Sequence, residues 1–290
     1  MTNQDIWSEW LLKRRFGQDP AQAKRTLHYL TPIRDRVLKN AALRADETVL
    51  DVGCGDGLVA FGALQQDPSV RVIFSDISRE LLDHARGLAA DANVIERCRF
   101  VRSSADDLSA VSDASVDVVT TRSVLIYVDA KQASFREFFR VLKPGGRLSI
   151  FEPINSFRRE QPEHMFWGFD VTPVREAASK VKALYESIQP PRADPMLNFD
   201  ERDLIVWAEE AGFIDIELDL HAEVKRPQDL NWETLMSAAP NPKIPALEEA
   251  LDRVLTATEK EAFIRHIRPQ LEGGTATFPE AISYLWALKR

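Results

Sequence analysis

Cysteine is scarce in this sequence, whose 290 residues include only Cys54 and Cys98. Two thiols cannot build the disulfide framework of a small secreted domain, and they cannot supply the four ligands of a cysteine zinc site. We therefore expect no structural metal. A reducing cytoplasm is the predicted location.

Long apolar runs are missing as well. No segment approaches the roughly 18 apolar residues that a membrane-spanning helix needs. The N-terminal stretch MTNQDIWSEWLLKRRF places acidic and basic side chains among the apolar ones and offers no cleavage site of a secretory signal. The sequence predicts no membrane span and no export.

An excess of positive charge is also absent. The chain has 37 Lys and Arg against 45 Asp and Glu, a net charge of −8, and its basic residues form only short runs such as Lys13–Arg15. Binding to DNA or RNA depends on a basic stripe that displaces counterions. A nucleic acid is therefore not an expected partner, and a small molecule is.

What the chain does contain is an ordinary globular composition, with 44% apolar and 28% charged residues. Its length fits one α/β domain carrying insertions about as well as two small domains. Proline is spread unevenly, since residues 1–151 contain four prolines and residues 152–290 contain twelve. The regular framework of the fold is therefore expected in the first half.

In that framework, apolar runs typical of buried strands alternate with segments of helical periodicity. We predict strands at residues 48–52, 70–75, 99–102, 116–121 and 147–151, and helices at 57–66, 78–90 and 131–142. A helix at 201–211 and strands at 213–220 and 281–288 complete the pattern. This alternation predicts βαβ units and a mainly parallel sheet with helices on both faces.

Other segments are expected to surround the sheet. Helices are predicted at 5–16 and 21–43, with Thr31-Pro32 restarting the second one, and at 229–238, 246–255 and 259–271. The predicted parts are an N-terminal helical lid at 1–44, a binding core at 45–152, a proline-rich insertion at 153–200, and the end of the sheet at 201–290 with a helical insertion at about 222–275.

The strongest motif follows the first predicted strand, where Asp51 precedes Gly53, Cys54, Gly55 and Gly57. Glycines let a ligand approach the backbone where any Cβ would clash. The spacing is G-x-G-x-G, and not the G-x-G-x-x-G of dinucleotide enzymes. The motif resembles the nucleotide-binding loop of class I S-adenosylmethionine-dependent methyltransferases, and the resemblance covers about residues 45–152. A tight turn without a ligand is the alternative interpretation.

The resemblance implies a Rossmann-like α/β fold whose seven-stranded, mainly parallel sheet receives its last strand antiparallel. It also implies S-adenosylmethionine as the cofactor. Asp76 ends the second predicted strand, about 20 residues after the glycines, where a carboxylate can accept both ribose hydroxyls. Ile77 is expected to pack on the adenine. After the third strand, the similarity implies that Asp106 reads the adenine amino group and that Ala105 lines the site.

Each aspartate alone would suit a loop cap, but their placement after successive strands favours a ligand. In the family, the end of the fourth strand faces the methionine portion and the methyl group. We therefore expect Thr121, Arg122 and Ser123 to line it. Arg122 is a candidate partner of the methionine carboxylate, and the equal alternative is that it packs its stem and pairs with a surface acid.

The acceptor side is predicted from the insertion at 153–200, which contains the segment HMFWGFD at 164–170. A sulfonium donor has a good leaving group, so positioning of the acceptor supplies much of the catalysis, and a hydroxyl acceptor also needs a base. His164 is the candidate catalytic base. Tyr29, Phe166 and Trp167 are candidate acceptor-binding residues. The alternative is that these aromatics only bury the insertion.

The predicted function is methyl transfer from S-adenosylmethionine to a small apolar or aromatic acceptor. A protein-carboxylate methyltransferase stays open, because residues 122–127 are locally like those of the chemotaxis-receptor glutamate methyltransferases. A non-catalytic module that binds S-adenosylmethionine also stays open. The helices within 222–275 either complete the acceptor pocket or form a homodimer interface.

Overall fold

The computed structural model describes residues 5–15, 20–158, 162–226 and 230–290. The chain divides into two compact units. One, which we call the helical unit, comprises Met1–Leu27, Asn155–Asn198 and Ala222–Ala281. The other, the sheet unit, comprises His28–Ile154, Phe199–His221 and Ile282–Arg290.

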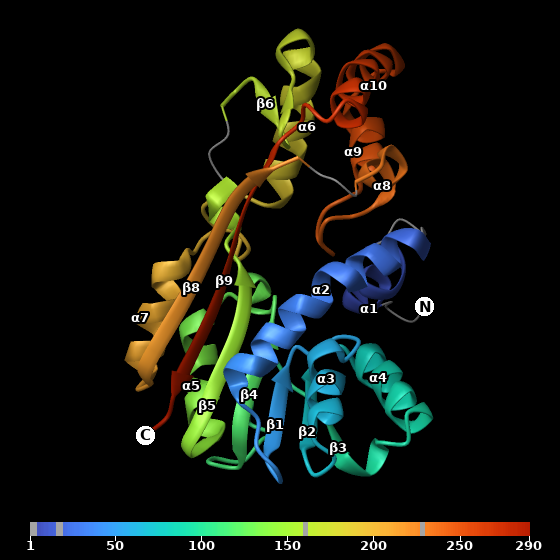
Figure 1. Ribbon diagram of the computed structural model, residues 1–290. Helices are drawn as coiled ribbons and strands as arrows, with labels where there is room; N and C mark the ends of the chain where they lie inside the picture. The colour runs from blue at the N-terminus through green and yellow to red at the C-terminus, as the bar shows by residue number, and fades with distance from the viewer. Residues whose placement is uncertain (1–4, 16–19, 159–161, 227–229) are drawn as a thin grey trace. The chain divides into compact units, whose positions relative to one another are not determined.

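The sheet unit is built on a seven-stranded sheet in the order β3-β2-β1-β4-β5-β9-β8 (Figure 1). Its strands are β1 (Thr48–Val52), β2 (Arg71–Asp76), β3 (Cys98–Arg102), β4 (Val116–Arg122), β5 (Leu142–Pro153), β8 (Ile214–Lys225) and β9 (Phe278–Leu288). Strands β1 to β5 pair in parallel, and β9 pairs antiparallel with β5. The predicted fold class is confirmed, including the antiparallel insertion of the last strand.

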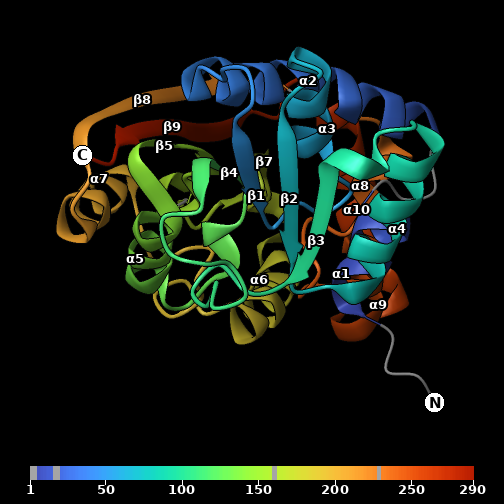
Figure 2. The same ribbon diagram turned by 90° about the horizontal axis from the view of Figure 1, so that it is seen from below.

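Helices cover both faces of this sheet. They are α3 (Leu58–Gln66), α4 (Arg79–Asp91), α5 (Lys131–Val141), α7 (Glu201–Ala211) and the later part of α2 (Pro20–Ala41). Figure 2 shows α2 and α3 on one face and α5 and α7 on the other. Leu38 of α2, Ala60 of α3 and Leu82 of α4 share one buried core with Val49 and Phe74. Three helices therefore pack on the same face.

The parallel strands β1, β2 and β4 end at one edge of the sheet. The strand order reverses between β1 and β4, because successive strands are added first on one side of β1 and then on the other. In open α/β sheets, ligands bind beyond the carboxyl ends of the strands at such a reversal. The fold therefore places the ends of these strands where a ligand site is expected.

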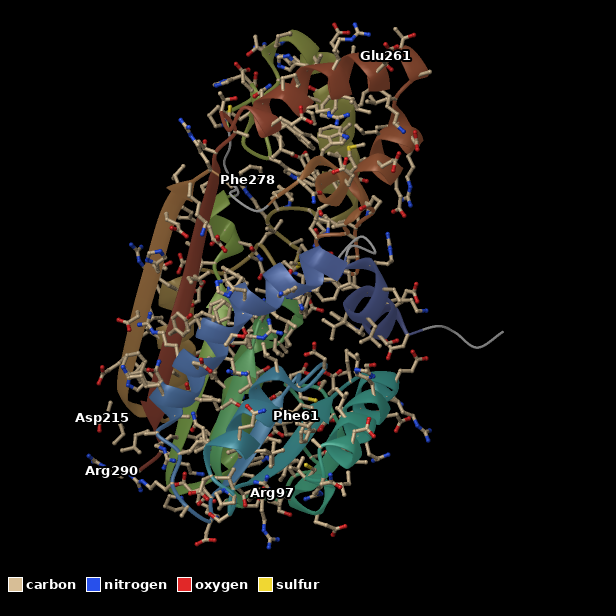
Figure 3. All side chains as sticks on the ribbon, turned by 45° about the vertical axis from the view of Figure 1, so that its right-hand side comes forward. Phe61, Arg97, Asp215, Glu261, Phe278 and Arg290 are labelled. Atoms are coloured by element: carbon tan, nitrogen blue, oxygen red, sulfur yellow. The ribbon has the colours of Figure 1, made fainter. Side chains whose placement is uncertain are left out.

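Aromatic packing fixes the position of β2. The ring of Phe74 lies 5.3 Å from that of Phe61 on α3 and 4.8 Å from that of Phe100 on β3, measured between centroids. Figure 3 shows Phe61 on its helix. Apolar contacts of this kind hold the strand whose end carries Asp76.

The helical unit has a core of its own. Its elements are α1 (Ile6–Glu9), the π-helix η1 (Trp10–Arg14), the short pair β6 (Met165–Phe166) and β7 (Phe169–Asp170), and the helices α6 (Arg175–Ile188), α8 (Trp232–Ser237), α9 (Leu247–Val254) and α10 (Ala257–Glu272). Phe166, Val181, Leu251 and Phe263 are buried together. Phe169 packs edge-on against Phe278, which Figure 3 labels.

The N-terminal segment is fastened to the late part of the helical unit. The Trp10 indole Nε1 donates to the Ala239 carbonyl at 2.8 Å, and Arg14 pairs with Glu249 at 2.9 Å. The Ala239 N–H donates to the Arg14 carbonyl at 3.2 Å. Residues far apart in the sequence thus hold η1 in place.

One prediction about local structure is wrong, and one helix is present that was not predicted. Pro32 does not restart a helix, because α2 runs unbroken from Pro20 to Ala41. A proline inside a helix removes one hydrogen bond, and burial of Leu30, Ile33 and Val37 stabilises the helix on both sides of it. In the insertion at 153–200, where no helix is predicted, α6 occupies Arg175–Ile188.

The predicted helices at the N-terminus and in the late insertion are found with different bounds. The first comprises α1 and the π-helix η1, and Phe16 at its predicted end lies outside the described residues. Within the described part of the chain, every helix is too short or too polar to cross a bilayer.

Candidate functional site

The glycine loop after β1 is held by backbone contacts at the ends of the strands. Gly53, Gly55 and Gly57 all have positive φ, at 63°, 54° and 86°. The Cys54 N–H donates to the Ser75 carbonyl of β2 at 2.9 Å. A Cβ at Gly53 would lie 2.4 Å from Val124 Cγ2, so a side chain there would collide with the segment after β4.

Asp76 joins this loop to the end of β2. Its Oδ2 accepts the Gly55 N–H at 2.9 Å, and its Oδ1 accepts the Ser78 N–H at 2.9 Å. The side chain is nearly buried, whereas Ile77 beside it is 41% exposed. Asp76 therefore has loop-capping contacts, and since a carboxylate oxygen can accept more than one hydrogen bond, these contacts are compatible with a ligand.

Asp51 lies beneath the loop and ties three elements together. Its Oδ1 accepts the Thr120 hydroxyl of β4 at 2.9 Å, and its Oδ2 accepts the Ala60 N–H of α3 at 3.1 Å. Burial raises the pKa of Asp51 to about 7, and the positive charge of Arg122 opposes that shift. Hydrogen bonds to a single carboxyl group, whose pKa lies near 7, thus connect β1 with β4 and α3.

Arg122 ends β4 and is half-buried. In the described part of the chain, no carboxylate lies within ion-pairing distance of its guanidinium. Its charge nevertheless acts on Asp51. The alternative in which Arg122 pairs with a surface acid finds no such acid among these residues, while its proposed ligand contact stays a prediction.

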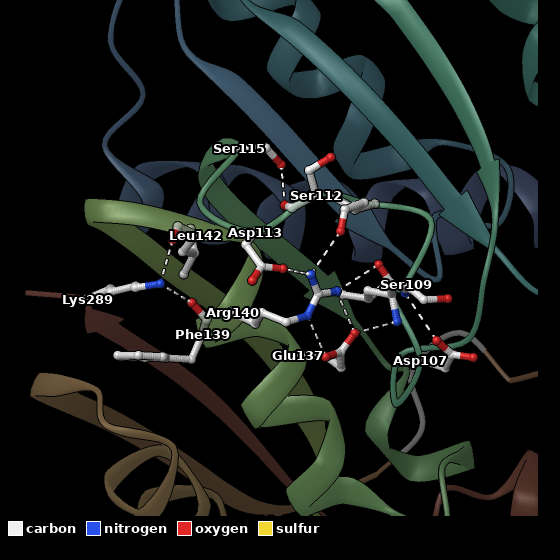
Figure 4. A network of polar contacts seen from close by, with 12 residues as sticks. Asp107, Ser109, Ser112, Asp113, Ser115, Glu137, Phe139, Arg140, Leu142 and Lys289 are labelled. Atoms are coloured by element: carbon white, nitrogen blue, oxygen red, sulfur yellow. Dashed lines mark hydrogen bonds and ion pairs between the residues drawn. The ribbon is translucent and has the colours of Figure 1, made fainter.

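Asp106 lies in the loop after β3, beside the buried Ala105. Its carboxylate accepts a short hydrogen bond from the Ser104 hydroxyl. The helix α5 holds the following residues, because Glu137 Oε2 accepts the Leu108 N–H at 2.8 Å. Arg140 pairs with Glu137 and donates to the Leu108 carbonyl at 2.9 Å (Figure 4). A polar network outside the predicted site thus holds Leu108, two residues after Asp106.

Glu152, near the end of β5, is a residue that sequence reasoning missed. It has no exposed surface, and its Oε1 accepts the N–H groups of Val124 and Leu125 at 2.9 Å each. Burial raises its pKa to about 7. The signal that would have found it is one acidic residue between the apolar neighbours Phe151 and Pro153 at a strand end.

Thr121 and Ser123 both touch this part of the site. Thr121 donates its hydroxyl to Glu152 at 3.4 Å, and the Ser123 N–H donates to the Phe151 carbonyl at 2.9 Å. Ser123 has φ of 57°, an unusual conformation for a residue with a side chain. The end of β4 is therefore fixed by contacts with β5.

The predicted acceptor residues belong to both units. Tyr29 lies on α2 in the sheet unit and is 45% exposed. In the helical unit, His164 is exposed and Phe166 is buried. Trp167 stacks on Phe166 and packs against Tyr185, with 5.0 Å between centroids in each pair. These aromatics do build the insertion's core, and their contact with an acceptor stays a prediction.

Residues 49–146 match the family model of a methyltransferase domain. The chain is 37% identical over 117 residues to the arsenite methyltransferase of Halobacterium salinarum, covering 40% of this chain and 29% of that protein. It is 35% identical over 129 residues to a ubiquinone biosynthesis O-methyltransferase of Xanthomonas oryzae pv. oryzae, covering 44% and 52%. The chain thus spans about half or less of the length of these relatives.

A solved structure shares the fold. Phosphoethanolamine N-methyltransferase 2 of Haemonchus contortus, in complex with S-adenosyl-L-methionine, superposes with a TM-score of 0.52 at 17% identity. The match covers 89% of this chain and 52% of that one. At such low identity, the likeness concerns the arrangement of strands and helices.

Proposed function

Because this chain belongs to the class I S-adenosylmethionine-dependent methyltransferases, we propose that it transfers a methyl group from S-adenosylmethionine to a small apolar or aromatic acceptor. The observation that carries the proposal is the contact of the Asp76 carboxylate with the Gly55 N–H. It joins, in one place, an acidic group suited to ribose hydroxyls and a loop suited to close approach of a ligand.

The residues present fit this cofactor. The side chain of Asp76 would accept the ribose hydroxyls, the exposed Ile77 would pack on the adenine, and Asp106 would accept from the adenine amino group. Arg122 supplies a positive charge at the end of β4, where it would pair with the methionine carboxylate. Bound S-adenosylmethionine supplies a methyl group on a sulfonium, which already has a good leaving group.

The task of this chain is therefore mainly one of positioning. The anchored glycine loop and the fixed end of β4 would orient the donor. Among the residues that the structure describes, no three His, Cys, Asp or Glu side chains gather as a metal site. Whether a base is required depends on the acceptor, and His164 is the proposed base if the acceptor is a hydroxyl.

An apolar or aromatic acceptor is supported by the aromatic side chains of residues 164–170. The relatives named above carry different names, one an arsenite methyltransferase and the other a ubiquinone biosynthesis O-methyltransferase. Family membership alone therefore does not select the acceptor of this chain.

Isothermal titration tests the first half of the proposal. The purified chain should bind S-adenosylmethionine and S-adenosylhomocysteine equally well with and without a chelator. Preferential binding of a nicotinamide dinucleotide would contradict the assignment.

A labelling experiment tests the second half of the proposal. With labelled donor and cell extract, the label should appear in the small-molecule fraction. Label in protein would indicate a protein methyltransferase, and binding without release of S-adenosylhomocysteine would indicate a silent binding module.

A further inference from the structure

The segment after β4 is held by a buried carboxylate from β5. Besides the N–H groups of Val124 and Leu125, Glu152 accepts the Ile126 N–H and the Thr121 hydroxyl, both at 3.4 Å. Four donors from one short stretch therefore converge on a single side chain. Three of the four donors belong to the 3₁₀ turn η3 (Leu125–Tyr127) and the residue before it.

The N–H groups at the start of a helical turn have no partner within that turn. Leu125 and Ile126 are buried, so their N–H groups would lose their hydrogen bonds if Glu152 were absent. An unpaired buried donor is costly. The Glu152 carboxylate thus stabilises the observed conformation of this turn.

The same turn touches the glycine loop. Because Gly53 has no Cβ, the Val124 side chain occupies the space that a Cβ would need. The loop is also bound to β2, through Cys54 N–H to Ser75 and Gly55 N–H to Asp76. A chain of direct contacts therefore leads from Glu152 through Val124 to the loop that we assign to the donor.

We propose that Glu152 is a positioning residue whose carboxylate holds Val124 against Gly53 and thereby keeps the glycine loop in the shape that binds the methyl donor. This inference rests on the proposed function, because it treats the loop as the donor site. Oε1 accepts three of the four hydrogen bonds, and Oε2 accepts the Ile126 N–H. Glutamine would offer one oxygen and would turn an NH₂ group toward the Ile126 N–H, where it cannot accept.

The test compares Glu152→Gln with Glu47→Gln. Glu47 is also a nearly buried carboxylate of the sheet unit, but it precedes β1 and binds the Arg44 N–H and Arg147 at the opposite edge of the sheet. We expect Glu152→Gln to raise the Kd of S-adenosylhomocysteine about tenfold. Glu47→Gln should leave the Kd within about twofold of wild type, whatever its effect on unfolding.

A second readout needs no ligand. In hydrogen exchange of the unliganded chain, Glu152→Gln should speed exchange of the amides at residues 53–57 as well as 123–127. Glu47→Gln should leave both stretches at the wild-type rate. Faster exchange at 123–127 alone would overturn the link to the glycine loop.

A double-mutant cycle tests the route through Val124. Val124→Ala removes the contact with Gly53 but keeps every N–H donor. If Glu152 acts through Val124, the double variant should bind S-adenosylhomocysteine no more weakly than the weaker single variant. Independent effects would multiply and would refute this route.

The outcomes separate the two proposals. If Glu152→Gln binds S-adenosylhomocysteine like wild type and merely unfolds at lower urea, Glu152 has a structural role only and the inference is wrong. If wild type does not bind S-adenosylhomocysteine, the proposed function is wrong. In that case, unchanged exchange at 53–57 in Glu152→Gln also rejects the positioning role, and faster exchange supports the contact pathway without the donor.

Discussion

The glycine loop of the sheet unit and the aromatic segment 164–170 of the helical unit use their residues differently. In the loop, glycines and Asp76 meet through backbone hydrogen bonds at the ends of strands. In the segment, Phe166 and Phe169 are buried, and Trp167 stacks on Phe166 and packs against Tyr185 at a tilt. The first arrangement leaves an exposed Ile77 beside an acidic group, while the second fills a core.

This difference shows which residue types carry functional information. A glycine at positive φ allows a tight turn and a close approach of a ligand or of another part of the chain, and a side chain would hinder both. Aromatic side chains build cores and binding pockets with the same contacts. The proposed donor site and the proposed acceptor site therefore both need experiments that separate a structural role from ligand binding.

The largest effect is expected for Gly55→Val. Gly55 has φ of 54°, where a β-branched residue is strained by about 1–2 kcal/mol, and its side chain would stand in the proposed donor site. Titration with S-adenosylhomocysteine should detect no binding, a loss of at least about 100-fold. Gly87→Ala is the matched control, because a Cβ at Gly87 in α4 would meet nothing within 4 Å. It should leave affinity unchanged and stabilise the helix by about 0.5–1 kcal/mol.

The next effect concerns the buried acids of the sheet unit. The pKa of Asp51 is raised from 3.8 to about 7. The folded state therefore holds a proton that the unfolded state releases. The resulting stabilisation is complete below about pH 4 and is lost as pH rises through 7. For a shift of this size, the loss is about 4 kcal/mol.

Asp51→Asn removes this titration while keeping the size of the side chain. Urea unfolding at pH 5 and pH 8 should show a smaller difference between the two pH values in the variant than in wild type. Glu152 contributes in the same direction, because its pKa is also raised to about 7, so part of the pH dependence should remain. Equal pH dependence in wild type and variant would contradict the assignment to Asp51.

The strand ends and the loop of the proposed donor site could be predicted from the sequence because their signals are local. Asp51 and the glycines lie in one strand–turn–helix, and Asp76 ends the next strand. Glu152 could not be found this way. Its partners are backbone N–H groups, which no particular residue type marks in the sequence. These groups lie in the segment after β4, whereas Glu152 lies on β5. The same holds for the Glu137–Arg140 network behind Asp106.

The helix α2 at Pro32 and the helix α6 in the proline-rich insertion were not predicted correctly, and the reason is the same for both. Its effect depends on where it falls in an element, and this depends on tertiary packing. Pro32 lies inside α2, whose apolar face is buried. Pro173 precedes α6 and Pro190 follows it, so these prolines bound a helix in a segment with no predicted one. The buried Ala177, Ala178 and Val181 were the available signal.

A smaller effect is expected for Asp76→Ala. Loss of a carboxylate that accepts two ribose hydroxyls should weaken donor binding by about 2–3 kcal/mol. Because Gly55 and Ser78 also donate to Asp76, we expect a fold cost of about 1–2 kcal/mol in addition. Titration and urea unfolding separate the two. Asp83→Ala, which removes an exposed acid of α4, should change neither. If the Asp76→Ala variant binds the donor normally but unfolds more easily in urea, then Asp76 only caps the loop and does not bind the donor.

The smallest effects on the donor are expected for His164→Ala and Trp167→Ala, which sharpen the comparison from the other side. Both residues belong to the helical unit, so the Kd of S-adenosylhomocysteine should stay within about twofold. Trp167→Ala should destabilise this unit by about 2 kcal/mol through lost aromatic contacts, and it should raise the KM of the acceptor if the ring also binds it.

His164 is exposed, and its removal should change stability by less than about 0.5 kcal/mol. If His164 is a general base, its removal should lower turnover by about 10²–10⁴-fold and flatten the acidic limb of the pH–rate profile. Exposed His84 on α4 provides the control, because His84→Ala should preserve both the turnover rate and the pH–rate profile. Turnover by His164→Ala within a few-fold of wild type, with an unaltered pH profile, would leave the histidine without a chemical role. An unchanged acceptor KM in Trp167→Ala would likewise assign the tryptophan to the core alone, because a ring that contacts the acceptor cannot be removed without loss of apolar contact.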